Sequence, residues 1–158
     1  MSKFAIFVVI FTKFLIIASQ KLQIDLYIES GCKYSKKFII EQLRPAYSTY
    51  KNDVAIKYIP FGKSESITTP DGTSFKCQHG PKECRGNMYQ SCGLFLIGDN
   101  QDRQTDFIEC EMSALSNEEA CAALVGLSVQ DIENCVSTKG VELQLEAEKA
   151  TKPILDQS

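Results

Sequence analysis

The segment GCKYSKKF, residues 31–38, places a cysteine where thiol–disulfide chemistry needs one. It follows LQIDLYIES, whose large apolar residues predict a strand, and it opens a pattern typical of a helix. Cys32 at the start of that helix would face backbone N–H groups that have no acceptor within the helix, which favours the thiolate. Lys33, Lys36 and Lys37 add positive charge in the first turns. A thiolate in this setting attacks a disulfide and forms a mixed disulfide.

Three positions after Cys32 the chain carries Ser35, where a two-cysteine motif would carry its second thiol. A serine hydroxyl is a very weak acid and forms no disulfide, so it cannot release a bound substrate. Three outcomes follow for Cys32. An external thiol such as glutathione resolves the mixed disulfide, the mixed disulfide persists and retains its client, or the site is inactive with Cys32 buried beneath the helix.

The first residues, MSKFAIFVVIFTKFLIIASQ, predict a signal peptide over residues 1–19. Lys3 precedes an apolar run that polar residues interrupt, so the run is too short and too broken for a stable membrane span. The small residues Ala18 and Ser19 offer a cleavage point. The alternative is an uncleaved membrane anchor. We expect entry into the secretory pathway, with residues 20–158 forming one domain.

The composition of the chain is that of a globular protein. Of its 158 residues, 44% are hydrophobic and 23% are charged, and the formal net charge is −3. Basic residues do not cluster strongly enough to indicate a nucleic-acid partner.

The seven cysteines of the chain predict disulfides. An exported chain meets an oxidising compartment, and an odd count leaves at least one cysteine free or bonded to another molecule. Cys32 stands alone, 45 positions before the next cysteine, so we expect it to be the unpaired one. The other six are candidates for three disulfides whose pairing the sequence leaves open: Cys77, Cys84, Cys92, Cys110, Cys121 and Cys135.

The first half of the chain predicts a βαβ unit. Leu22–Ile28 and the segment from Val54 to Pro60 have strand patterns, and Lys33 to about Lys51 has a helical one. Two strands joined through a helix pair in parallel. We expect Pro45 to kink the helix. Its expected apolar face consists of Phe38, Ile39, Leu43 and Tyr47.

The second half predicts a loop followed by short helices. KSESITTPDGTSF is expected to be a loop with a turn at Pro70-Asp71-Gly72. The segments NMYQSCGLFLI, DFIECEMSAL, NEEACAALVG and VQDIENCVSTKGVELQLEAEKA have helical patterns. Ser116-x-x-Glu119 and Ser128-x-x-Asp131 predict the N-termini of two of these helices. Cys121 and Cys135 lie on them and are expected to staple them.

A dense motif, CQHGPKECRGNMYQSC, occupies residues 77–92. His79, the only histidine of the chain, has the ligand types of a zinc site beside Cys77, Cys84 and Cys92. Export favours disulfides instead, so we expect no metal. His79 is interpreted as a hydrogen-bonded loop residue, with a general base as the alternative. Gly80 and Gly86 are interpreted as turn positions.

This motif resembles the signature of the gamma-interferon-inducible lysosomal thiol reductase family, without a gap. The matching positions are Cys77, Gln78, His79, Gly80, Glu83, Cys84, Asn87 and Cys92. The likeness extends from about residue 22 to 152. It implies a thioredoxin-like fold with a disulfide-stapled helical insertion, and reduction of protein disulfides in lysosomal or endosomal compartments.

Two departures from the family pattern change what we expect. Ser35 replaces the second active-site cysteine, and Pro153 is followed by only five residues, so the ββα half of a thioredoxin-like domain is expected to be missing. Pro153 is therefore not assigned the role of the family's cis-proline. Two strands alone leave sheet edges unpaired, which predicts a homo-oligomer or a partner that completes the sheet.

We therefore predict a thiol–disulfide oxidoreductase that acts on protein disulfides through Cys32 alone and is resolved by an external thiol. The alternative is a catalytically impaired, cysteine-rich binding or accessory protein that retains the fold. No cofactor is expected beyond a small thiol such as glutathione. Lysosomal, endosomal or secreted locations are all compatible with the sequence. Tyr34, next to Cys32, is interpreted as a cover for the thiol or as a substrate contact.

Overall fold

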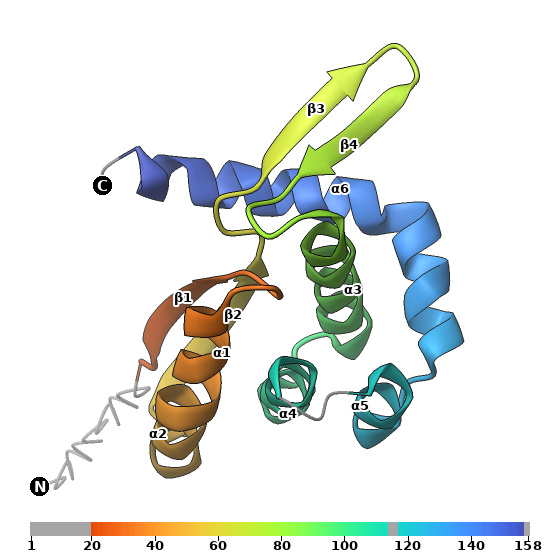
Figure 1. The fold of residues 1–158 in the computed structure, drawn as a ribbon. Helices are drawn as coiled ribbons and strands as arrows, with labels where there is room; N and C mark the ends of the chain where they lie inside the picture. The colour runs from red at the N-terminus through yellow and green to blue at the C-terminus, as the bar shows by residue number, and fades with distance from the viewer. Residues whose placement is uncertain (1–19, 114–116, 157–158) are drawn as a thin grey trace, which may run out of the picture.

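The computed structural model describes residues 20–113 and 117–156 (Figure 1). The predicted signal peptide, residues 1–19, and the predicted helix cap Ser116 lie outside the described residues. The strands and helices follow one another as β1 Leu22–Ile28, α1 Lys33–Phe38, the π-helical turn η1 Ile39–Leu43, α2 Arg44–Tyr50, β2 Val54–Pro60, β3 Glu65–Thr69, β4 Gly72–Lys76, α3 Pro81–Ile97, α4 Gln101–Met112, α5 Glu118–Leu124 and α6 Val129–Leu155.

The predicted βαβ unit is confirmed. β1 and β2 pair in parallel over their whole length, from Leu22 opposite Val54 to Ile28 opposite Pro60. The helical segment between them lies against this sheet, while α3 and α6 also contact β2 (Figure 1). The fold is thus a thioredoxin-like α/β arrangement in which helices joined by disulfides accompany a small parallel sheet.

The first helix runs without a break from Lys33 to Tyr50, with a π-helical turn in its middle. Pro45 has no backbone N–H to donate to the carbonyl of Glu41, and the helix widens just before the proline. Ile39, Leu43 and Tyr47 are buried as predicted.

Phe38 was wrongly assigned to this buried face, since 37% of it is exposed. Ile39, Leu43 and Tyr47 follow one another at intervals of four and share a face. Phe38 lies one position away, about 100° around the helix, and therefore points elsewhere.

The prediction of a loop after β2 was wrong for most of its length. β3 and β4 form an antiparallel hairpin, with Glu65 opposite Lys76 and Thr69 opposite Gly72. The predicted turn at Pro70 and Asp71 joins them. The hairpin stands out from the body and crosses α6 (Figure 1). Its side chains are mostly exposed, so the apolar alternation that signals a half-buried strand is absent.

The helical half contains one long helix rather than short helices alone. α6 has 27 residues, includes Pro153 and begins at a capping box formed by Ser128 and Asp131, as predicted. α5 begins differently: the side chain of Asn117 accepts from the N–H of Ala120 and takes the role assigned to Ser116.

Three disulfides fasten these elements. Cys77–Cys84 closes the loop before α3, Cys92–Cys135 joins α3 to α6, and Cys110–Cys121 joins α4 to α5. Cys121 and Cys135 therefore staple helices as expected, each through a different partner.

A single large apolar core joins the sheet to the helices. Ile28 and Ile56 of the strands are buried together with Phe107, Ile108 and Ile132 of α4 and α6. Gln144 of α6 is buried as well, and it donates to the carbonyl oxygen of Pro60 at 3.1 Å and to Ser91 Oγ at 2.8 Å. These bonds fix α6 against the carboxyl end of β2, close to the candidate site.

Among the described residues, none of the helices is both long and apolar enough to cross a bilayer.

Candidate functional site

Cys32 lies at the junction between β1 and α1, as the sequence predicts. It occupies the N-cap position of α1, and its side chain makes no capping hydrogen bond. Its N–H donates to the Glu29 carbonyl oxygen at 3.1 Å, and its own carbonyl accepts from the N–H of Lys36 at 3.0 Å. The thiol is half-buried and unpaired, whereas the other six cysteines are bonded in disulfides.

Ser35 turns back toward the strand. Its Oγ accepts a hydrogen bond from the N–H of Glu29 at 3.3 Å. The hydroxyl therefore lies in the first turn of α1, where it fixes the end of β1 and offers no second thiol.

Tyr34 does not cover the thiol. The side chain is 71% exposed, and the Lys33 ammonium lies 5.0 Å from its ring centroid. It remains available at the surface beside Cys32.

The motif at residues 77–92 places His79 close to Cys32. The Cys77–Cys84 disulfide closes a short loop at the start of α3. Gly80 caps α3 with φ +90°, a conformation that glycine adopts without strain, and Pro81 begins the helix. His79 lies in this closed loop.

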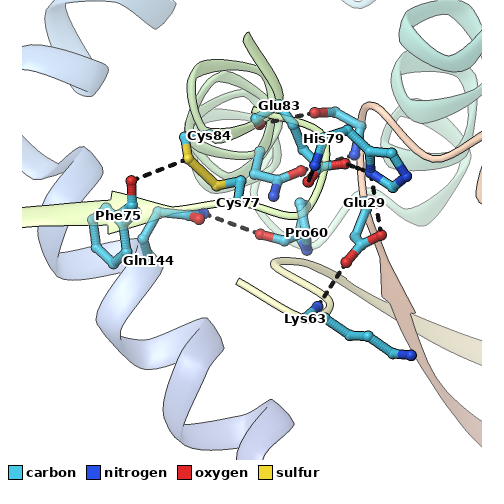
Figure 2. The surroundings of a disulfide bond; sticks show 11 residues. Glu29, Pro60, Lys63, Phe75, Cys77, His79, Glu83, Cys84 and Gln144 are labelled. Atoms are coloured by element: carbon cyan, nitrogen blue, oxygen red, sulfur yellow. Dashed lines mark hydrogen bonds and ion pairs between the residues drawn. A yellow bond between two sulfur atoms is a disulfide. The ribbon is translucent and has the colours of Figure 1, made fainter. Parts of the chain in front are cut away.

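Glu83 holds His79 at two points (Figure 2). Its Oε1 accepts from the His79 backbone N–H at 3.0 Å, and its Oε2 lies 2.5 Å from the ring Nδ1. The Glu83 side chain is completely buried, whereas the His79 side chain remains 40% exposed. The histidine is thus a hydrogen-bonded loop residue, as interpreted, but it is also oriented toward the thiol site.

Glu29, which was not predicted from the sequence, completes the site. It is 94% buried at the end of β1, its Oε1 accepts from the Lys63 N–H at 2.7 Å, and its Oε2 lies 3.7 Å from His79 Nδ1. Glu29, Cys32 and His79 each offer one potential ligand atom. These three atoms lie within 4.8 Å of one another. A charged residue at the carboxyl end of a parallel strand, three positions before Cys32, was the signal that could have identified it.

Other motif residues on α3 form hydrogen bonds with Ser30, which lies two positions before Cys32. Ser30 donates from its N–H to Asn87 Oδ1 at 2.8 Å and from its hydroxyl to the Glu83 carbonyl at 3.0 Å. Gly86 lies within α3 rather than in a turn, which corrects its interpretation. A Cβ atom there would lie 2.4 Å from Ser30 Oγ, so the glycine permits this close approach.

Two motif residues take no part in these contacts. Gln78 is exposed, and Cys92 is buried in its disulfide with Cys135. The ligand set considered for zinc is therefore not assembled, because Cys77, Cys84 and Cys92 are all in disulfides.

Comparisons with known proteins agree with the motif. A family model described as gamma interferon inducible lysosomal thiol reductase (GILT) matches residues 23–138. GILT-like protein 1 of Drosophila melanogaster is 38% identical over 109 residues, which are 63% of this chain and 44% of that protein. GILT-like protein 2 of the same fly is 30% identical over 128 residues, covering 78% of this chain and 58% of its own length.

A vertebrate relative also matches. The gamma-interferon-inducible lysosomal thiol reductase of Carassius auratus is 35% identical over 75 residues, which are 48% of this chain and 30% of that protein. The chain spans less than half the length of the first curated relatives it matches. The family model nevertheless covers most of the chain, and the chain belongs to the gamma interferon inducible lysosomal thiol reductase family.

Proposed function

We propose that the protein carries out thiol–disulfide exchange on protein disulfides with Cys32 as its single nucleophile. The observation that carries the proposal is the position of this thiol. Cys32 is unpaired at the N-terminus of a helix, with a serine where a resolving cysteine would stand. Relatives of the chain are named thiol reductases, which supports the reaction class.

The exchange begins when the Cys32 thiolate attacks one sulfur of a substrate disulfide. The Cys32–substrate bond forms while the substrate S–S bond breaks, and the second substrate sulfur leaves as a thiolate that takes up a proton. An external small thiol then attacks the Cys32 sulfur and frees the first substrate sulfur. A second external thiol releases Cys32. Overall, two external thiols are oxidised to one disulfide and the substrate disulfide is reduced to two thiols.

The half-buried position of Cys32 suits this reaction. Cys32 is neither fully buried nor fully exposed, and Lys33, Lys36 and Lys37 place positive charge on the same helix. The exposed Tyr34 offers an apolar contact for an unfolded substrate segment beside the sulfur. We place the reaction in the secretory pathway, in lysosomes, endosomes or outside the cell.

A second function has one observation in its favour. Because Ser35 is hydrogen-bonded to the end of β1, the first turn is intact without a resolving thiol. The protein would then act as an accessory protein that retains clients through a persistent mixed disulfide, and no turnover would follow.

The stoichiometry of reduction separates the two functions. The mature protein is mixed with a disulfide-containing protein, first without and then with glutathione. Under exchange, product formation stops at about one equivalent without glutathione and continues with it. Cys32→Ser should abolish both the single equivalent formed without glutathione and the turnover with it. Turnover by the wild-type protein without any added thiol would contradict single-cysteine exchange, whereas no turnover in glutathione would favour the accessory function.

Restoring the second thiol gives a further test. Ser35→Cys should release substrate without glutathione, because the new thiol lies in the first turn of α1, as Ser35 does. Ser48→Cys, an exposed serine on α2, is the matched control and should behave as the wild type.

A further inference from the structure

We propose that Glu29, Cys32 and His79 form a binding site for a divalent cation of the zinc class. One potential ligand atom of each lies within 4.8 Å of the other two. The three residues come from the end of β1, the start of α1 and the loop before α3. Sulfur, imidazole nitrogen and carboxylate oxygen are the ligands that proteins use for Zn²⁺, at about 2.0–2.3 Å from the metal. Small side-chain adjustments would contract the cluster onto one ion.

The charges around the cluster favour a cation. Glu29 and Glu83 are both more than nine-tenths buried. Among the described residues no lysine or arginine forms a salt bridge with either carboxylate, and the His79 ring is the basic group beside both. Buried charges are normally paired or coordinate a metal. A divalent ion would compensate the charge of these carboxylates and of the Cys32 thiolate.

One carboxylate oxygen of Glu29 is directed at the cluster without a hydrogen bond. Oε1 is occupied by the N–H of Lys63 at 2.7 Å. Oε2 accepts no hydrogen bond from a described residue, and its 3.7 Å separation from His79 Nδ1 is too long for one. In Figure 2 the Glu29 side chain extends from β1 toward the His79 ring. This oxygen is therefore free to bind an ion beside the His79 ring.

Glu83 prepares His79 as a ligand. A histidine that binds a metal usually donates its other ring N–H to a carboxylate, which fixes the tautomer and the direction of the ring. The bond between His79 Nδ1 and Glu83 Oε2 has this form, and it leaves Nε2 to bind the ion. The Cys77–Cys84 disulfide and the backbone bond from His79 to Glu83 hold the loop in place around it.

Three protein ligands leave the fourth position of a tetrahedral ion to water or another small donor. On binding, the Cys32 thiol gives up its proton to solvent and its sulfur becomes a metal ligand. That sulfur is then unavailable for attack on a disulfide. If the proposed exchange function holds, on which this consequence rests, zinc-class ions inhibit the exchange.

Cobalt(II) is the probe for this site because a thiolate–cobalt bond has a charge-transfer absorption in the near ultraviolet. Mature protein with its three disulfides intact and Cys32 reduced is titrated with Co²⁺, and Zn²⁺ is then added as competitor. We expect about one equivalent of Co²⁺ to bind with a charge-transfer band and tetrahedral visible bands, and Zn²⁺ to displace it. No charge-transfer band in the reduced wild-type protein would overturn the proposal.

Variants assign the ligands. Cys32→Ser should remove the charge-transfer band, while His79→Gln and Glu29→Gln should keep a weak band and lose at least about tenfold in affinity. Glu83→Gln should weaken binding by about 10–100-fold. Glu142→Gln, an exposed carboxylate on α6, is the matched control and should bind as the wild type. Unchanged affinity in both His79→Gln and Glu29→Gln would overturn the proposed ligand set.

Alkylation of Cys32 by iodoacetamide in the folded wild-type protein removes the thiol without a mutation. It should abolish the band, and a band that survives would place the metal elsewhere. The two proposals fail separately. A Co²⁺ site without glutathione-dependent turnover would contradict exchange alone, and turnover without a Co²⁺ band would contradict the metal site alone.

Discussion

A Cβ atom on Gly31 would lie 2.7 Å from Glu83 Oε2, so the residue next to Cys32 must be a glycine for this carboxylate to stay where it is. The same Cβ would lie 3.1 Å from the His79 Cβ. The loop that carries the thiol and the loop that carries the family motif therefore meet at a contact with no room for a side chain. This contact explains why residues about 50 positions apart in sequence form one site.

Gly31→Ala should separate the motif loop from the thiol. The new methyl group forces Glu83 and His79 away, because the buried carboxylate has little space to move. We expect Co²⁺ affinity to fall at least about tenfold and the free energy of unfolding to fall by about 1–3 kcal/mol. Cobalt titration and denaturant unfolding measure the two effects. Wild-type cobalt affinity in Gly31→Ala would show that Glu83 and His79 need not stay close to Cys32.

The Cys77–Cys84 disulfide should position His79 rather than only stabilise the fold. Replacing both cysteines by serine opens the loop that holds His79. We expect the His79 amide to exchange hydrogen faster, Co²⁺ to bind more weakly, and the free energy of unfolding to fall by about 2–4 kcal/mol. Amide exchange, cobalt titration and denaturant unfolding give the three values.

Replacing Cys110 and Cys121 by serine is the matched control. That disulfide closes a segment of similar length between α4 and α5. It should lower stability to a similar degree while leaving the His79 amide and cobalt affinity unchanged. An equal effect of both double variants on cobalt binding would mean that the Cys77–Cys84 bridge acts through global stability alone.

The sequence predicted the frame of the site well because its signals are local. A strand, a helix start and a cysteine follow one another within residues 22–33, and each is encoded by neighbouring residues. The capping box at Ser128 was predictable for the same reason. The unpaired state of Cys32 in the structure matches its isolation from the other cysteines.

The contacts across the site could not be predicted this way. Glu29 faces His79 because β1 and the loop before α3 meet in space, and no spacing within either segment records that meeting. The β3–β4 hairpin was missed because its polar, exposed strands carry no apolar alternation. Asn117 replaced Ser116 as a helix cap because both residues can cap, and adjacent capping residues leave the exact start of a helix open.

Glu148 should make the hairpin sensitive to acid. Burial acts to raise the pKa of this carboxyl, but hydrogen bonds from Ser66 of β3 and Lys152 outweigh it, so the pKa lies below its ordinary value. A lowered folded-state pKa gives stability that is present above the unfolded-state pKa and is lost as pH falls through the folded-state one. We expect the Ser66 amide to lose protection from hydrogen exchange on acidification.

Glu148→Gln should abolish this acid-dependent step, because an amide does not ionise. Glu146→Gln, an exposed neighbour on α6, is the control and should keep the step. Protection of Ser66 that is independent of pH in the wild-type protein would show that Glu148 does not hold the hairpin.

The edges of the small parallel sheet should favour self-association. Within the described part of the chain, β1 and β2 pair only with each other, and Leu22 at the start of β1 is 66% exposed. An unpaired edge with exposed apolar residues recruits another strand. We expect light scattering of the protein to show a dimer or larger species, and Leu22→Lys to shift it toward the monomer. A monomer at all concentrations would contradict this expectation.

Glu111 should reduce stability as the pH rises toward neutrality. It lies near the end of α4, and its Oε1 is buried without a hydrogen bond. Burial, and next the negative charge of Glu118, raise the pKa of Glu111 from 4.5 to about 7. Between these values the unfolded chain has lost the proton while the folded chain keeps it. The folded state binds more protons, so the free energy of unfolding falls as pH rises through this window.

Glu111→Gln should remove this fall, since glutamine stays neutral at every pH. We compare the free energy of unfolding of the variant with that of the wild type at each pH. The difference between the two should change in favour of the variant by on the order of 2 kcal/mol from pH 4 to pH 8. Denaturant unfolding of both proteins across this range measures the gain, and Glu142→Gln, exposed on α6, controls for the loss of a surface charge. If the free energy of unfolding falls equally in Glu111→Gln and the wild type between pH 4 and 8, the proton on Glu111 does not cause the pH dependence of stability.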